Sequence, residues 1–315
     1  MTGAEISETP DTSSTGRAVS LSHGPLPVRE SVLLGLAVLG VSATGPLAAA
    51  AQAPALAIAF WRNAAASTVL LGGLAFRRRE RRPDGADRSA MRLSLLSGVF
   101  LAGHFATWIP SLTMTSVAAS TALVCAAPLW SGLIARMRGA RLGGRVWAGM
   151  ALALVGVLLI GGADFQTSST ALAGDLLALT GALCMAAYLT VGESARRVVD
   201  TATYARTSYA AAAVLLLVTC LLSGSALFGY SAHTWLLLAA LTVCGQLIGH
   251  TLFNRSLKLL NGHTVATITL LEVPGAALLA AVWLGQTPSP AVVVGIVVVL
   301  LGVHMAIRAQ RTRTG

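Results

Sequence analysis

The chain has 315 residues, of which 55% are apolar and only 11% are charged, and its mean hydropathy is +0.74. An ordinary soluble domain could not bury that much apolar surface, so the composition excludes that class. The formal net charge of +10 would suit a nucleic-acid-binding protein if the basic residues formed one face, but they fall between long apolar runs. We therefore expect an all-α integral membrane protein that binds no nucleic acid.

The apolar runs have the length of membrane spans. Crossing ~30 Å of hydrocarbon takes roughly 20 helical residues. Residues 1–30 are rich in Ser, Thr, Gly and Pro and are predicted to be a disordered cytoplasmic tail. Residues 309–315 are predicted to be a second cytoplasmic tail. Between the tails we predict ten transmembrane helices, at 31–51, 54–76, 93–113, 117–136, 146–163, 171–191, 205–223, 234–254, 264–284 and 290–307.

The arginines predict how these helices are oriented. Connections 163–171, 224–233 and 286–288 contain no Arg or Lys, whereas the connections that alternate with them and both tails hold nearly all of the basic residues. Positively charged loops stay on the cytoplasmic side of a membrane. We therefore predict a multi-pass protein of the plasma or inner membrane with both termini in the cytoplasm, which requires an even number of spans.

An internal repeat divides the predicted helices into two sets of five, 31–163 and 171–308. Because five is odd, the second set crosses the membrane in the opposite sense, and such inverted repeats characterise secondary transporters. A similar match joins the segments around Arg62 and Arg206 at an offset of 144 residues. At an offset of 146 residues, without gaps, the matched residues are Gly103 with Gly249, His104 with His250, and Pro128 with Pro274.

Four short stretches carry a family resemblance: AIAFWR at 57–62, AAPL at 126–129, GDLLA at 174–178 and LLEVP at 270–274. In their order, spacing and duplication the chain resembles the drug/metabolite transporter superfamily, in its ten-helix EamA branch. The resemblance covers about 33–308. It implies translocation of small metabolites or drugs, commonly export, without ATP and without a cofactor.

Glu272 is the strongest candidate for a functional residue. It lies about eight residues into the ninth span, roughly 12 Å from the cytoplasmic boundary. A carboxylate in hydrocarbon costs several kcal/mol, so we expect it to face a cavity or a partner, and burial favours its protonated form. Glu272 is therefore a candidate proton carrier; alternatively, it is a protonated glutamate that only holds the bundle together.

Arg62 is the basic residue that lies well inside a span. Its guanidinium keeps its proton, so it must find water, an anion or carbonyl groups, and it is a candidate for binding a substrate carboxylate. The alternative is an arginine that reaches outward to the membrane surface. Direct pairing with Glu272 is compatible with the predicted depths of the two residues.

Further polar and aromatic candidates lie in neighbouring spans. The repeat-related histidines His104 and His250 can relay protons or bind substrate, or else simply pack the bundle. Asn254 follows His250 by four residues and shares its helix face, so it can add hydrogen bonds. Three aromatic residues complete the predicted binding or coupling site: Trp61, Trp108 and Tyr188.

Pro128 and Pro274 interrupt corresponding helices of the two repeats. A proline frees backbone carbonyls, which a cavity or a neighbouring helix must then satisfy. Paired interruptions in the two halves of a transporter indicate a binding site. We therefore expect these prolines to break their helices and to take part in gating or in forming a cavity.

Together these features predict a secondary transporter of amino acids, related metabolites or drugs, driven by protons or by substrate gradients. The expected partners are a small-molecule substrate, protons and membrane lipids, in a monomer or homodimer. One alternative is a membrane-embedded enzyme or flippase acting on a lipid-linked substrate. Such an enzyme would need a cluster of His, Asp, Glu or Cys near the membrane surface, and the non-cytoplasmic loops offer only scattered groups such as Asp164 and His233. Another is a non-transporting sensor or assembly subunit.

Overall fold

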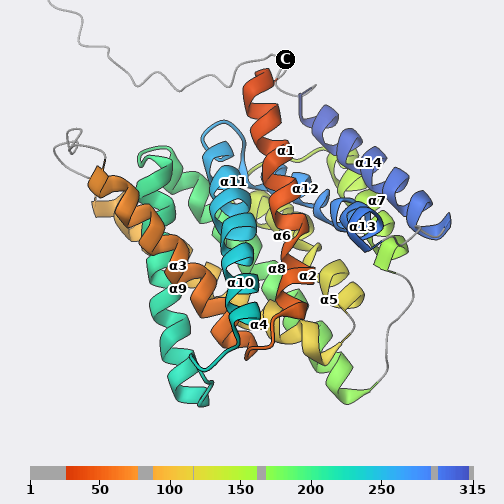
Figure 1. Ribbon diagram of the computed structural model, residues 1–315. Coiled ribbons are helices and arrows are strands. Elements are labelled where there is room, and N and C mark those ends of the chain that lie inside the picture. Colours follow the sequence, from red (N-terminus) through yellow and green to blue (C-terminus); the bar gives the residue numbers. More distant parts are fainter. Residues whose placement is uncertain (1–25, 77–87, 116, 162–167, 285–289, 312–315) are drawn as a thin grey trace, which may run out of the picture.

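The computed structural model describes residues 26–76, 88–115, 117–161, 168–284 and 290–311, and every regular element in these ranges is a helix (Figure 1). In chain order the elements are α1 (Val28–Ser42), α2 (Thr44–Ala50), α3 (Ala55–Phe76), α4 (Arg88–Met114), α5 (Val117–Val124), α6 (Ala127–Met137), α7 (Gly144–Gly161), α8 (Ser169–Arg196), α9 (Thr201–Ser223), α10 (Ala232–Leu241), η1 (Thr242–His250), α11 (Thr251–Ser256), α12 (Gly262–Thr269), α13 (Glu272–Leu284) and α14 (Pro290–Arg311).

These elements form ten helical crossings of the bundle, which confirms the predicted all-helical fold. Six crossings are single helices: α3, α4, α7, α8, α9 and α14. The other four are interrupted: α1 with α2, α5 with α6, α10 with the π-helix η1 and α11, and α12 with α13. Within the described residues, seven crossings are long and apolar enough to span a membrane, while α7 and α14 carry shorter apolar stretches.

The helices at the two ends of the chain extend into the predicted tails. α1 begins at Val28 and includes Glu30, whose carboxylate accepts hydrogen bonds from Nη2 and Nε of Arg255 at 2.7 and 3.3 Å. This ion pair orders the start of α1 against α11. At the other end, α14 continues to Arg311. The remaining tail residues, 1–25 and 312–315, lie outside the described residues.

Two internal helices are also longer than the apolar runs that predict them. α4 begins at Arg88, five residues before the predicted span, and α8 continues to Arg196, five residues beyond its predicted span. Hydropathy falls at the first charged side chain, but a helical backbone can continue while a long arginine side chain reaches polar surroundings. The predicted spans therefore mark the apolar centres of the helices rather than their ends.

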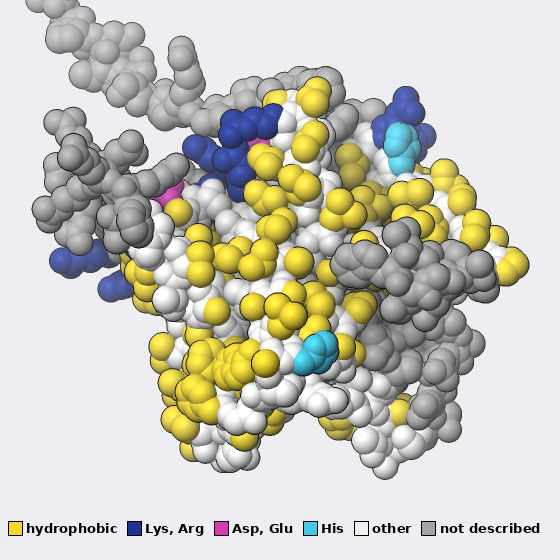
Figure 2. Space-filling view, viewed as in Figure 1, with side chains coloured by type: hydrophobic (Ala, Val, Ile, Leu, Met, Phe, Trp, Pro, Cys, Tyr) yellow, Lys and Arg dark blue, Asp and Glu magenta, His cyan; other side chains and the backbone are white. Residues whose placement is uncertain are grey.

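Basic side chains gather at the end of the bundle where α1 begins and α14 ends. We call this the basic end; on the face drawn in Figure 2, Lys and Arg lie toward the upper part of the molecule and apolar side chains cover the middle. The opposite end contains the connection between α9 and α10, which holds no Arg or Lys. This separation matches the alternation of basic loops in the sequence.

The apolar interior contains two main packed units. The larger unit draws its buried residues mainly from α1, α3, α4, α8, α9 and α12, and includes Phe105, Tyr188 and Leu216. The second joins α5, α7, α13 and α14 around Val157 and Val299. α7 and α14 lie side by side (Figure 1). The two units therefore separate the outer pair α7 and α14 from the six-helix core.

Candidate functional site

A small central cavity lies where the four interrupted crossings meet. Its lining includes Val41 and Thr44 at the junction of α1 and α2, Cys125 between α5 and α6, and Glu272 at the start of α13. His250, the last residue of η1, lines it from the fourth interrupted crossing. The cavity has a volume of about 50 Å³, enough for a few water molecules. Backbone irregularity at membrane depth is tolerated where it borders such a cavity.

The prolines explain two of the four interruptions. Pro128 lies at the start of α6, and Pro274 lies in the first turn of α13; both are buried. Neither proline has an N–H to continue the helical ladder, so the chain breaks two to four residues earlier, at 125–126 and 270–271. The prolines themselves do not line the cavity, but residues at the breaks do. The predicted helix breaks are therefore present in both repeats.

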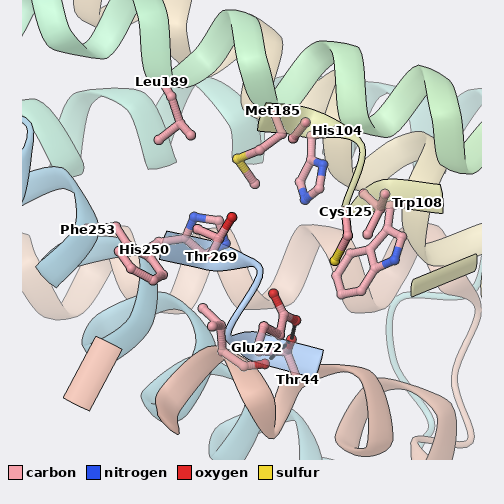
Figure 3. Close-up of a pocket in the computed structure, with 13 residues that line it drawn as sticks. Thr44, His104, Trp108, Cys125, Met185, Leu189, His250, Phe253, Thr269 and Glu272 are labelled. Carbon is pink, nitrogen blue, oxygen red and sulfur yellow. Dashed lines mark hydrogen bonds between the residues drawn. The ribbon is translucent and has the colours of Figure 1, made fainter. Parts of the chain in front are cut away.

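Glu272 opens α13 and lines the cavity from the second repeat. Its Oε1 lies 3.4 Å from Oγ1 of Thr44, and the single hydroxyl proton of Thr44 is directed mainly to the carbonyl of Val41 at 2.7 Å. Figure 3 shows the two side chains together on one side of the cavity, with Met185 and His104 on the other. Glu272 thus has one weak partner and faces the cavity.

The structure brings the two repeat-related histidines together. Their ring centroids are 6.5 Å apart, and both side chains line the cavity. The ring of His104 lies 2.9 Å, through Nδ1, from the carbonyl of Gly181. A carbonyl can only accept, so Nδ1 carries the proton and Nε2 is the accepting nitrogen of the neutral ring. His104 is therefore held in an orientation in which a ligand proton can be accepted.

Trp108 lies one turn after His104 on α4 and stacks on it, with ring centroids 5.5 Å apart and planes 16° apart. The indole is 4% exposed and lines the cavity. Its Nε1 donor is buried and finds no partner among the described residues. Buried indole N–H groups usually have a partner. A ligand or water in the cavity can supply the missing acceptor.

Arg62, in the middle of α3, is completely buried. Its Nε donates to Oε1 of Gln246 at 3.1 Å, and Nε2 of Gln246 donates to Oδ1 of Asn63 at 3.0 Å. The guanidinium carbon lies 4.1 Å from the centroid of the Phe105 ring, a cation–π contact. Arg62 therefore does not reach outward to the membrane surface, as one interpretation of the sequence allows.

The two terminal nitrogens of Arg62, Nη1 and Nη2, are buried and have no hydrogen-bond partner among the described residues. A guanidinium offers five donors, and burying it without partners costs free energy. Gly245 packs closely against this part of Arg62. A Cβ added at Gly245 would lie 2.8 Å from Nη2 and 2.4 Å from Cγ2 of Thr44. Arg62 therefore has two guanidinium nitrogens without a partner, next to Thr44, the residue that contacts Glu272.

Arg62 and Glu272 do not form the direct ion pair that the sequence permits. The described ion pairs within 4.0 Å are Arg197 with Glu193 and Arg255 with Glu30. Thr44 lies between the two groups. Its hydroxyl contacts the Glu272 carboxylate, and its methyl carbon and Nη2 of Arg62 both lie close to Gly245. A buried cation and a partly buried acid thus flank the same residue without direct contact.

Tyr188 and Asn254 lie next to the cavity, between it and the basic end. Both are completely buried; the Tyr188 hydroxyl donates to Oδ1 of Asn254 at 2.7 Å, and Nδ2 of Asn254 donates to the Tyr209 hydroxyl at 3.2 Å. The ring of Tyr188 lies 6.2 Å from that of His250. Neither Tyr188 nor Asn254 lines the cavity in this conformation. They form a hydrogen-bonded layer behind it.

Trp61 lies away from the cavity, unlike the other predicted site residues. Its Nε1 donates to the carbonyl of Leu227 at 2.8 Å, and its ring packs edge-on against Phe228 and Trp235. These contacts tie the start of α3 to the connection between α9 and α10. Trp61 thus packs against the α9–α10 connection in this conformation and does not line the cavity.

Several residues at the site have no place among the sequence predictions. Thr44, Cys125, Met185 and Thr269 line the cavity. Gln246, which holds Arg62, is an amide inside a predicted span, and an intramembrane polar residue is a signal that sequence reading can use. No comparable signal marks Met185 or Cys125, because their residue types are common in apolar helices.

Comparison with known proteins agrees with this architecture. The profile of the EamA-like transporter family matches residues 30–162 and 172–308, which together make up most of the chain. A solved crystal structure shares the fold with a TM-score of 0.72 at 20% identity, covering 90% of this chain and 98% of its own. No curated protein matches the chain. The chain belongs to the EamA-like transporter family and is a multi-pass membrane transporter, not an enzyme.

Proposed function

We propose that the protein is a secondary transporter that exports small metabolites, such as amino acids or related carboxylates, or drugs, by proton-coupled alternating access. In this proposal the membrane is the plasma or inner membrane. The basic end faces the cytoplasm, because basic loops are retained on that side. The central cavity is the substrate site, and Glu272 is the proton carrier.

Alternating access is supported by the position of the cavity. Its lining combines Trp108 and Leu189 from the six-helix unit with Cys125 from the unit that contains α7 and α14. Movement of one packed unit against the other would open the cavity to one end or the other. The breaks in α5–α6 and α12–α13 are natural points for such movement because no continuous helical ladder crosses them.

A substrate with a negatively charged group is supported by the spare donors. Arg62 offers Nη1 and Nη2, and Trp108 offers Nε1; all three are buried and have no partner among the described residues. A planar carboxylate can accept both guanidinium donors in a bidentate pair. Arg62 does not line the cavity in this conformation, so this pairing requires a small rearrangement at Thr44.

The observation that carries the coupling proposal is the environment of Glu272. The carboxyl group lines the largely apolar central cavity at a helix break, near two histidines, and one 3.4 Å hydrogen bond is its described contact. A purely structural acid inside a membrane would be expected to have more partners. Proton uptake and release by Glu272 can therefore occur without dismantling a hydrogen-bond network.

The test is Glu272→Gln, which imitates the protonated form with nearly unchanged volume. We expect proton-driven accumulation to be abolished, while substrate counterflow, which needs no net proton movement, survives. Both would be measured in proteoliposomes containing equal amounts of folded protein, over pH about 5.5 to 8.5. The substrate would first be found from a panel of small carboxylates and drugs.

Thr264→Val serves as the matched control, because Thr264 lies in the first turn of α12, in the same crossing, and does not line the cavity. If Glu272→Gln keeps the pH dependence of the wild type, Glu272 is not the proton carrier. His104 and His250 would then be the next candidates, since both line the same cavity.

A further inference from the structure

A second cavity opens at the basic end of the bundle, and the proposed function does not use it. Its volume is about 280 Å³, larger than that of the central cavity. We call it the vestibule. The residues that define it here are Ser131, Ala135 and Arg138 on α6, Glu193 and Arg197 at the end of α8, and His263 at the start of α12.

The vestibule continues the route from the central cavity along the same three helices. Ala127 of α6 and Leu189 of α8 line the central cavity, and one helical turn further on Ser131 and Glu193 line the vestibule. One turn corresponds to a rise of about 5.4 Å. α12 closes the route between them, because Gly262 packs so tightly on α8 that a Cβ would lie 3.1 Å from the carbonyl oxygen of Leu189.

The walls of the vestibule carry positive charge on two sides. Arg138 reaches from α6 toward α8, where its Nη2 donates to Oγ of Ser194 at 3.3 Å. Arg197, with a side chain 73% exposed, lies on α8 and pairs with Glu193 at 3.0 Å. A guanidinium on each wall suits a small anion better than a neutral or cationic ligand, and arginine pairs well with planar carboxylates.

Glu193 occupies the donors that such an anion would use. Its Oε1 accepts from Nη2 of Arg197, and its Oε2 accepts at 2.9 Å from the backbone N–H of Gly262 in the first turn of α12. A backbone N–H at a helix N-terminus is a favourable place for an anion. The Glu193 carboxylate therefore ties α8 to α12 at the point where the route is closed.

Ser131 points independently to a ligand. It is 1% exposed, it lines the vestibule, and its Oγ has no hydrogen-bond partner among the described residues. A buried hydroxyl without a partner is unfavourable, and hydroxyl groups can both donate and accept. A molecule that fills the vestibule would supply the missing partner.

From these contacts we propose that the vestibule is a binding site for the carboxylate of a small soluble molecule, through which cargo passes between the cytoplasm and the central cavity. The entering carboxylate takes over Arg197 and the N–H of Gly262 from Glu193, which releases α12 from α8. The role in transport rests on the proposed function. The binding itself does not, and it can be tested without transport.

The test measures anion selectivity at a cysteine inside the vestibule. The full chain, with its four native cysteines replaced by alanine, would carry Ser131→Cys and be placed in nanodiscs of neutral lipid. Alkylthiolation by a negatively charged sulfonatoethyl and a positively charged trimethylammonioethyl methanethiosulfonate would be followed by mass, each rate divided by that for 2-mercaptoethanol. We expect the normalised anionic rate to exceed the cationic one by about tenfold, as in an electrostatically focused cleft.

Three comparisons make this result specific to the vestibule. Combined Arg138→Gln and Arg197→Gln should remove the preference, whereas combined Lys258→Gln and Arg308→Gln, which removes two exposed charges at the same end, should keep it. Malonate at constant ionic strength should slow the labelling, and Glu193→Gln should speed the anionic reagent because the competing carboxylate is gone. Ala135→Cys provides a second probe position if Ser131→Cys does not fold.

Equal normalised rates at both positions, or a preference that survives the double arginine change, would overturn the proposal. So would an absence of labelling at both positions, since the vestibule would then be closed to soluble molecules. If phosphatidylglycerol in the nanodisc blocks labelling and malonate does not, the site is one for a lipid headgroup and the proposal is wrong. The outcome of the Glu272→Gln transport test does not affect these labelling results. The proposed proton coupling and the proposed vestibule site can therefore fail independently of each other.

Discussion

Arg62 and Arg196 are both buried, yet the protein treats their guanidinium groups in opposite ways. Arg196, 3% exposed at the end of α8, donates through Nε to the carbonyl of Asn254 at 3.1 Å and through Nη2 to Oγ1 of Thr201 at 2.6 Å, while Nη1 donates to the carbonyl of Val199. Arg62, 0% exposed in α3, has one such bond, from Nε to Gln246.

The contrast separates a structural cation from a binding one. All three nitrogens of Arg196 are used, and their acceptors lie on α11, in the connection between α8 and α9, and at the start of α9, so this side chain ties the end of α8 to these segments. Arg62 keeps two donors unused at membrane depth, a costly arrangement that a static structural role would not need. We infer that Arg196 stabilises the fold and that Arg62 is kept for a ligand.

Removing the structural cation should have the largest effect on stability. Arg196→Gln leaves three acceptors without their charged donor, and hydrogen bonds to charged groups contribute about 1.5–3 kcal/mol each in favourable cases. We expect a loss of about 3 kcal/mol in the free energy of unfolding, measured by denaturation in detergent. The neighbouring Arg197→Gln, at an exposed i,i+4 pair, should cost less than about 1 kcal/mol. Equal losses for the two variants would remove the distinction between them.

Arg62→Gln should show the reverse pattern. Transport should fall by at least about tenfold, corresponding to about 1.4 kcal/mol of lost binding, because the bidentate donors are gone. Stability should stay the same or rise, since a buried charge with two unused donors is removed. Arg206→Gln, at the repeat-related position, is the control and should retain transport in proteoliposomes. A destabilisation of Arg62→Gln as large as that of Arg196→Gln would contradict this assignment.

Gly245→Ala tests whether the position of Arg62 matters as well as its charge. The added methyl group would lie 2.4 Å from Cγ2 of Thr44 and 2.8 Å from Nη2 of Arg62, so one of these side chains must move. We expect a partial loss of transport, about threefold to tenfold, at a stability cost of about 1–3 kcal/mol. Gly35→Ala on α1 has open space around it and should leave transport unchanged. Full activity of Gly245→Ala would show that Arg62 needs no fixed position.

The smallest effect is expected at Trp61, which lies outside the cavity. Trp61→Phe removes the hydrogen bond to the carbonyl of Leu227 but retains an aromatic ring against Phe228 and Trp235. We expect a stability loss of about 1 kcal/mol and no change in the substrate concentration at half-maximal transport. A clear change in that concentration, with Trp108→Phe measured alongside, would return Trp61 to the binding site.

Much of the architecture follows from the sequence alone. Apolar runs of about 20 residues predict the ten crossings because hydrocarbon thickness sets the length of a span. The offset of 146 residues identifies His104 and His250 as corresponding residues of the two repeats. Pro128 and Pro274 predict helix breaks because proline cannot complete the helical ladder. These are local properties, which depend on residue type and spacing along one chain.

Only the tertiary structure decides which polar groups are satisfied. Sequence places Arg196 among ordinary loop arginines and Trp61 beside Arg62, whereas packing buries Arg196 under three acceptors and turns Trp61 toward another loop. The Thr44 contact to Glu272 and the vestibule at Glu193 also depend on residues far apart in the chain. Length and hydropathy fix where a helix crosses the membrane, but its rotation, and hence the partners of each side chain, is set by contacts with neighbouring helices.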